Sequence, residues 1–165
     1  MKLSIFLYFV ILLLVSFTIM KRKLHLLENI FLYIIVVFVM TTYSAALYVN
    51  SSLWEISVNK DLFVIFRIYQ AFGYPFIWIL FFNGLPGRET PVYRWSYTVI
   101  FICAQLALEQ WLVQWKVIIV DGWSLFGSLV IQSFVLFFTA IALKWYRRLL
   151  RKEGITEDVH SPNRI

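Results

Sequence analysis

Five runs of apolar residues constrain this chain more than any other feature of its sequence. About 20 apolar residues in helical conformation are needed to cross the hydrocarbon of a bilayer. A transmembrane β-barrel would instead show segments of about 10 residues with alternating polarity, and that alternation is absent. The sequence therefore predicts an all-α, polytopic membrane protein, a bundle of five transmembrane helices. The runs, each 18–21 residues long, are 3–20, 30–49, 62–82, 96–115 and 124–143.

Composition supports one membrane domain rather than a soluble chain. Of the 165 residues, 61% are hydrophobic and 15% are charged, against roughly 45–50% and about 25% in soluble domains. We expect a single domain over residues 1–154. The net charge of +6 does not indicate nucleic-acid binding, because the basic residues cluster at the ends of the apolar runs, where they act as topology determinants.

A basic segment, residues 144–153, follows the fifth run and ends before Gly154, a helix stop signal. We expect it to be a helical extension lying on anionic lipids of the inner leaflet, at about 1 kcal/mol per basic residue. Docking onto a partner protein is the alternative. Residues 155–165 are polar and are predicted to be a disordered cytoplasmic tail. The basic residues of the extension are Lys144, Arg147, Arg148, Arg151 and Lys152.

The distribution of Lys and Arg predicts the orientation. The first run is followed at once by residues 21–23 (KRK) and lacks a small-residue cleavage site, so we expect an uncleaved anchor with its N-terminus outside; a cleaved signal sequence is the alternative. Five crossings then place 11 basic residues inside and three, Lys2, Lys60 and Lys116, outside. This bias predicts a cytoplasmic C-terminus.

Polar side chains inside the runs are the candidate functional residues. Arg67 lies five residues from the outer end of its run and Glu109 six residues from the outer end of the next, which is about 8 and 9 Å of helix. Because both charges share one depth, we expect an ion pair between them, braced by the neighbouring glutamines. The polar residues expected to converge are Tyr43, Arg67, Gln70, Gln105, Glu109 and Gln132.

Three interpretations of this cluster remain open. The favoured one is structural, a buried ion pair that sets helix register. The second is a solute, ion or proton site that opens outward. In the third, Arg67 snorkels to the headgroups and Glu109 is protonated. Gly73 and Pro75 predict a break in the third run, which we attribute to packing.

The sequence does not predict catalysis, a cofactor or a metal site. His25 and His160 have no partner at metal-ligand spacing, and the catalytic motifs HExxH, GxSxG and GxxxxGK[ST] are absent. The many tryptophans fall at predicted membrane interfaces, where they are typical of an aromatic belt. These interfacial residues are Trp54, Trp95, Trp115, Trp123 and Trp145.

Two stretches of the sequence carry a resemblance to a known family. In residues 69–83 the matching residues are Tyr74, Pro75 and Asn83, with Gln70 where the family has Asp. In residues 108–123 the sequence follows a Glu-x-Trp-Leu…Gly-Trp pattern that begins at Glu109. Val113 and Lys116 replace a Glu and a Thr of the family pattern. In these stretches the chain resembles a family of small multi-pass membrane proteins from spore-forming Gram-positive bacteria. The resemblance implies a fold and a bacterial cytoplasmic membrane, but no activity.

These features predict a non-enzymatic integral membrane protein. The favoured function is a structural or accessory component with a buried Arg–Glu pair, acting through partner helices or a homo-oligomer. The alternative is a small protein that binds or transports a solute, an ion or protons through the polar cluster.

Overall fold

The computed structural model describes residues 1–154 except 22, 52 and 86–89. It is 81% helical and contains five helices long and apolar enough to cross a membrane. Arg88, His160, Arg164 and the predicted disordered tail lie outside the described residues. The five spans are Lys2–Ile19, Leu26–Val49, Lys60–Gly84, Pro91–Gln114 and Leu125–Lys152.

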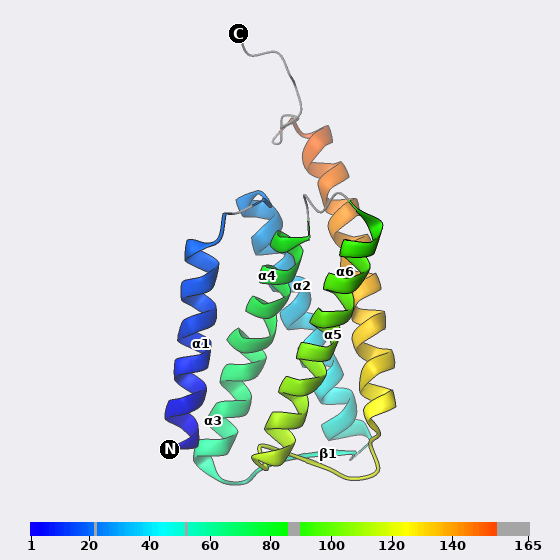
Figure 1. The fold of residues 1–165 in the computed structure, drawn as a ribbon. Helices are drawn as coiled ribbons and strands as arrows, with labels where there is room; N and C mark the ends of the chain where they lie inside the picture. Colours follow the sequence, from blue (N-terminus) through cyan, green and yellow to red (C-terminus); the bar gives the residue numbers. More distant parts are fainter. Residues whose placement is uncertain (22, 52, 86–89, 155–165) are drawn as a thin grey trace.

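The five spans run side by side as a bundle (Figure 1). Two of them contain a π-helical turn. The second span joins α2 to η1, and the third span joins α3, η2 and α4. The elements are α1 (Lys2–Ile19), α2 (Leu26–Ala45), η1 (Ala46–Asn50), α3 (Lys60–Ile68), η2 (Tyr69–Gly73), α4 (Tyr74–Gly84), α5 (Pro91–Gln114) and α6 (Leu125–Lys152).

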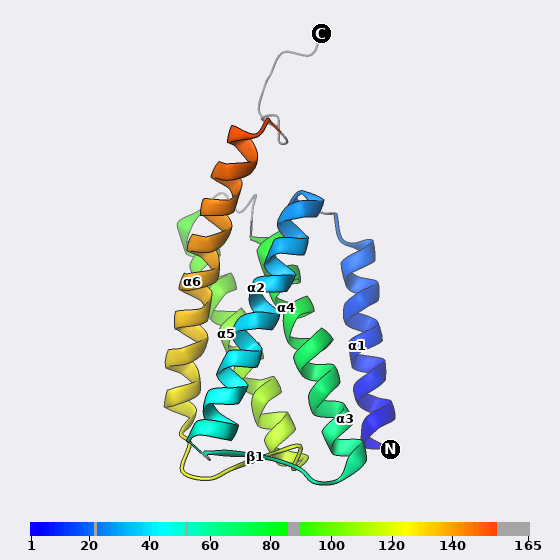
Figure 2. The ribbon, with the colours of Figure 1, turned by 180° about the vertical axis from the view of Figure 1, so that it is seen from behind.

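Two short strands, β1 (Trp54–Ile56) and β2 (Ile118–Val120), pair antiparallel across one end of the bundle (Figures 1 and 2). We call this end the sheet end and the opposite one, where α6 projects, the tail end. The strands were not predicted. Trp54, expected in the headgroup layer, is 2% exposed, because its ring packs edge-on against Tyr43 at 5.1 Å between centroids.

Local capping explains where several helices begin. At the start of α2, His25 and Glu28 form a capping box, which satisfies free N–H groups of the first turn. The side chain of Asn59 caps α3, and that of Ser124 caps α6. Pro91 opens α5, where its missing N–H costs nothing. As a result α2 begins four residues, and α5 five residues, before the predicted starts.

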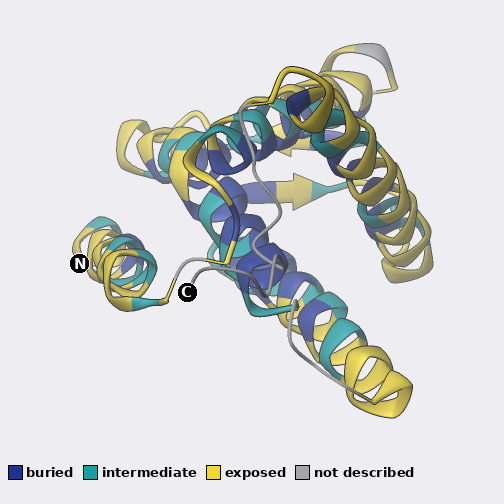
Figure 3. Cartoon of the chain, turned by 90° about the horizontal axis from the view of Figure 1, so that it is seen from above, coloured by how far each residue is buried: buried dark blue, intermediate teal, exposed yellow. Residues whose placement is uncertain are grey.

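The span Lys60–Gly84 forms the centre of the fold, and α1 lies at its margin. Half of the most apolar window of Lys60–Gly84 is buried, against 11% for α1. Figure 3 shows the buried residues on the helix faces that look inward and the exposed ones around the outside. Tyr69, Tyr74 and Trp78 are among the largest fully buried side chains.

The helix break predicted at Gly73 and Pro75 is instead a π-helical turn inside a continuous span. The N–H of Tyr74 donates to the carbonyl of Tyr69 five residues earlier. Pro75 has no N–H for the carbonyl of Ala71, and the hydroxyl of Tyr33 on α2 donates to that carbonyl at 3.0 Å. A neighbouring helix thus satisfies the group that proline leaves free.

Candidate functional site

The predicted ion pair between Arg67 and Glu109 is wrong. Among the described residues, Glu109 contacts no basic side chain, and the ion pair that forms joins Arg147 to Glu28. The rotation of α3 accounts for this. The buried face of α3 carries Ile65 and Phe66, which turns Arg67 to the exposed side.

Arg67 belongs to a small polar patch on the outside of the bundle. Its guanidinium lies 5.0 Å from the centroid of the Phe63 ring, and its Nη1 donates to Gln70 Oε1 at 3.2 Å. The amide of Gln70 donates in turn to Thr41 Oγ1 on α2 at 3.4 Å. Gln70 is therefore buried between α2 and η2, but it does not reach Gln105 as we expected.

Glu109 lies on the inward face of α5 and is 3% exposed. The Ser128 hydroxyl of α6 donates to Glu109 Oε1, and the Trp123 indole Nε1 donates to Ser128 Oγ at 2.8 Å. Two hydrogen bonds in series, from Trp123 to Ser128 and from Ser128 to Glu109, thus connect the carboxyl group to the sheet end. Both donors are uncharged.

Gln132 and Tyr74 form the next layer toward the middle of the bundle. Gln132 lies four residues, about one turn, after Ser128 on the same face of α6. The Tyr74 hydroxyl donates to Gln132 Oε1 at 2.9 Å. This bond joins α4 to α6 at Tyr74, the first residue after the π-helical turn.

Two polar groups of this region have no hydrogen-bond partner among the described residues. Both atoms of the Gln105 amide are unpaired, and so is the Tyr43 hydroxyl. Gln105 is 1% exposed and lies one turn from Glu109 on the same face of α5. Tyr43 lies against Trp123, with ring centroids 6.5 Å apart. We call the whole set the Glu109 cluster: Tyr43, Tyr74, Gln105, Glu109, Trp123, Ser128 and Gln132.

The Glu109 cluster concentrates hydrogen-bonding capacity that the protein does not use. Of the other unpaired buried atoms, those on Trp54 and Trp78 belong to rings that pack against Tyr43 and Tyr74 of the cluster, and one more is on Thr139. A buried polar group without a partner costs about 1–3 kcal/mol, and natural structures leave few of them. Within the described residues no three His, Cys, Asp or Glu side chains gather as metal ligands. The acceptors that remain are amide, hydroxyl and carboxyl oxygens.

A second polar cluster, at the tail end, was not predicted. Asn83 is 1% exposed, and its Oδ1 accepts from the backbone N–H groups of Lys23 and Leu24 at 3.2 Å. Its Nδ2 donates to Asn29 Oδ1 at 2.6 Å, and the amide of Asn29 donates to the carbonyls of Leu24 and His25 at 3.1 Å. Two asparagines therefore tie the turn between α1 and α2 to α4.

The observed ion pair completes this cluster. Arg147 Nε lies 2.6 Å from Glu28 Oε1, with side chains 38% and 9% exposed. Beside it, the rings of Phe31 and Tyr146 stack at 4.0 Å. Arg147, one of the residues expected at the membrane surface, fastens α6 to α2, and α6 continues unbroken through the extension. We call Glu28, Asn29, Asn83 and Arg147 the tail-end clamp.

Sequence reasoning found part of the site. Of the six predicted residues, Tyr43, Gln105, Glu109 and Gln132 belong to the Glu109 cluster, and the other two do not. Ser128 was missed as a ligand of Glu109, although its spacing of four from Gln132 on a helix was visible. Asn83 and Tyr74 appeared only as motif residues of the resemblance.

No family model, curated protein sequence or solved structure matches this chain. The functional argument therefore depends on the geometry of its own residues.

Proposed function

We propose that this chain is a non-enzymatic, multi-pass protein of a bacterial cytoplasmic membrane, and that its Glu109 cluster binds a small cation. That cation is a proton or a metal ion.

The exposed surface supports the membrane location. The span in α1 has a mean hydropathy of 2.3 and is only 11% buried. Phe38, Phe126 and Phe134 are each at least two-thirds exposed. A continuous apolar surface of this kind is unfavourable in water and suits hydrocarbon.

The basic residues support an orientation with the N-terminus outside. Lys2, Lys60 and Lys116 lie at the sheet end, whereas Lys21, Arg94 and the five basic residues of the α6 extension lie toward the tail end. The excess of positive charge favours a cytoplasmic tail end. The sheet end, with β1 and β2, would then face outward.

Among the residues that the structure describes, no basic side chain lies beside Glu109, and this observation carries the binding proposal. An ionised carboxylate buried at this depth is costly unless its charge is neutralised. Ser128 supplies a hydrogen bond but no positive charge. A proton or a metal ion would neutralise the carboxylate, and unpaired oxygens such as Gln105 Oε1 would complete a set of hard ligands. Intramembrane carboxyl groups commonly mark ion or proton pathways.

The structural role we favoured from sequence depended on an ion pair that does not form. A narrower accessory role remains a second candidate, because Arg67 is exposed on the flank of the third span. In hydrocarbon a guanidinium there would favour an acidic residue on a partner helix.

Infrared difference spectroscopy of the full chain in lipid nanodiscs tests the binding function. We expect the carboxyl band of Glu109 to change on titration with acid or on addition of sodium ions, and Glu109→Gln to abolish that change. Glu28→Gln, which removes a carboxylate already paired with Arg147, is the matched control and should keep it. A Glu109 band that responds to neither protons nor sodium refutes the proposal.

Reporter fusions test the topology separately. Fusions after residues 57, 90, 120 and 165 should alternate outside, inside, outside and inside. Any other order contradicts the orientation without bearing on the chemistry at Glu109.

A further inference from the structure

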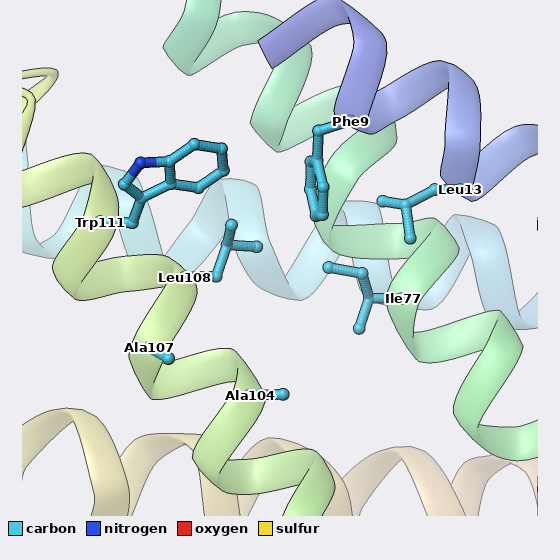
Figure 4. A pocket seen from close by; sticks show the side chains of 7 residues that line it. All are labelled: Phe9, Leu13, Ile77, Ala104, Ala107, Leu108 and Trp111. Carbon is cyan, nitrogen blue, oxygen red and sulfur yellow. The ribbon is translucent and has the colours of Figure 1, made fainter. Parts of the chain in front are cut away.

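An apolar groove runs along the flank of the bundle, on a different face of α5 from the Glu109 cluster. Its volume is about 520 Å³. Phe9 and Leu13 of α1 face Trp111 of α5 across the groove, and Ile77 of α4 forms its floor (Figure 4). Ala104 and Ala107 contribute only methyl groups to the α5 wall, which leaves room between the helices.

The groove is closed toward the sheet end. Trp111 packs against Phe9 at 5.7 Å and against Phe6 at 6.2 Å between ring centroids. Beyond these rings, Lys2 Nζ of α1 donates to the Trp115 carbonyl at 3.1 Å. Both ribbon views show α1 and α5 diverging from this contact toward the tail end (Figures 1 and 2).

Positive charge stands at the tail end of both walls. Lys21 follows α1 and Arg94 lies in the first turn of α5, and both are exposed. Leu13 is eight residues from Lys21, or about 12 Å of helix. One leaflet's hydrocarbon is about 15 Å deep, so an acyl chain anchored at the level of Lys21 would reach the groove.

We propose that this groove holds an acyl chain of an anionic phospholipid from the inner leaflet, whose headgroup phosphate lies at the level of Lys21 and Arg94. The uncharged lining selects a hydrocarbon chain, and the two basic side chains select a negative headgroup. This inference rests on the proposed membrane location and orientation, but not on cation binding at Glu109.

Native mass spectrometry of the full chain, purified in mild detergent and titrated with phosphatidylglycerol or phosphatidylcholine, tests the proposal. We expect one phosphatidylglycerol to bind, and Ala104→Leu/Ala107→Leu to weaken it about tenfold by filling the groove. Ala140→Leu, on the exposed flank of α6, is the control and should bind as the wild type does. Equal binding by the groove variant and the control, or equal loss in both, overturns the groove.

A second pair of variants tests recognition of the headgroup without changing the residues that line the groove. Lys21→Gln/Arg94→Gln should weaken phosphatidylglycerol about tenfold and leave phosphatidylcholine unchanged. Lys144→Gln/Arg148→Gln, which removes two exposed charges from α6, is the matched control. Equal affinity of the wild type for the two lipids overturns the anionic selection. Glu109→Gln should bind lipid normally, so failure of the lipid site and failure of the cation site are separable.

Discussion

The two polar clusters of this bundle differ in how completely they are paired. In the tail-end clamp, Asn83 Oδ1 accepts two hydrogen bonds, and its Nδ2 donates to Asn29 and to a backbone carbonyl. Glu28 meets a cation. In the Glu109 cluster, the carboxyl group meets no cation, and the amide of Gln105 has no partner among the described residues.

The paired residues of the tail-end clamp hold helices together, whereas the unpaired groups of the Glu109 cluster still have hydrogen-bonding atoms for a ligand. A fully satisfied network rigidifies a core, whereas a partly satisfied one costs stability that only a ligand or a function would offset. We therefore regard the tail-end clamp as a structural element of the fold and the Glu109 cluster as the candidate site. Four substitutions measure this contrast, each by reversible unfolding in mixed detergent micelles.

Asn83→Ala should have the largest effect, a loss of about 3 kcal/mol in the free energy of unfolding. It leaves two backbone N–H groups and the Asn29 carbonyl oxygen without their partner, at about 1–3 kcal/mol for each unsatisfied buried group. Gln114→Ala, on an exposed position of α5, is the control and should be nearly neutral. A loss below about 1 kcal/mol would mean that the clamp does not hold the fold.

Arg147→Ala should lower the free energy of unfolding by about 2 kcal/mol, because it leaves the Glu28 carboxylate without its partner. The partial exposure of Arg147 makes this loss smaller than that for a fully buried ion pair. The neighbouring Arg148 is exposed and forms no ion pair in the described part of the chain, so Arg148→Ala should change little. Equal effects at the two positions would show that α6 is held by general charge and not by this contact.

Gln105→Met should raise stability by about 1 kcal/mol, since it removes an unpaired buried amide while keeping a side chain of similar length. The opposite sign is expected for Asn29→Leu in the tail-end clamp, where the amide is paired. Destabilisation by Gln105→Met would show that its amide is satisfied, and the contrast between the clusters would disappear.

Tyr33→Phe should lower the free energy of unfolding by about 1 kcal/mol, because it removes one hydrogen bond and leaves the Ala71 carbonyl free. The double variant Tyr33→Phe/Pro75→Ala restores an N–H at position 75 and should recover most of the loss. The measured cost of losing this hydrogen bond gives the scale for the other hydrogen bonds of the bundle. If its removal costs nothing, single hydrogen bonds contribute little to this bundle, and the predicted cost of Asn83→Ala must be lowered.

Much of the fold could be predicted because the length of an apolar run, and the position of a residue within it, can be counted along the chain. All five helices lie where runs of 18–21 apolar residues predict them. Counting residues along two of these runs also led us to expect a pairing of Arg67 with Glu109. Whether the two side chains pair could not be predicted this way, and in the structure they do not. Whether a side chain faces a neighbour depends on helix rotation, which is set by packing of residues such as Ile65 and Phe66 against other helices.

The same limit explains the missed tail-end clamp. Asn29 and Asn83 are 54 residues apart, and nothing local marks them as partners. The π-helical turn at Tyr69–Gly73 likewise could not be predicted from its own residues, because the hydroxyl that satisfies the Ala71 carbonyl belongs to Tyr33 on another helix.

The sequence alone thus determined five apolar helices and the polar residue types inside them, because hydrophobicity and helical rise act along the chain. Only the tertiary structure decided which polar groups meet. It joined Arg147 to Glu28 and Asn83 to Asn29, and within the described part of the chain it left Glu109 without a basic partner, because contacts between helices depend on rotations that no single helix specifies.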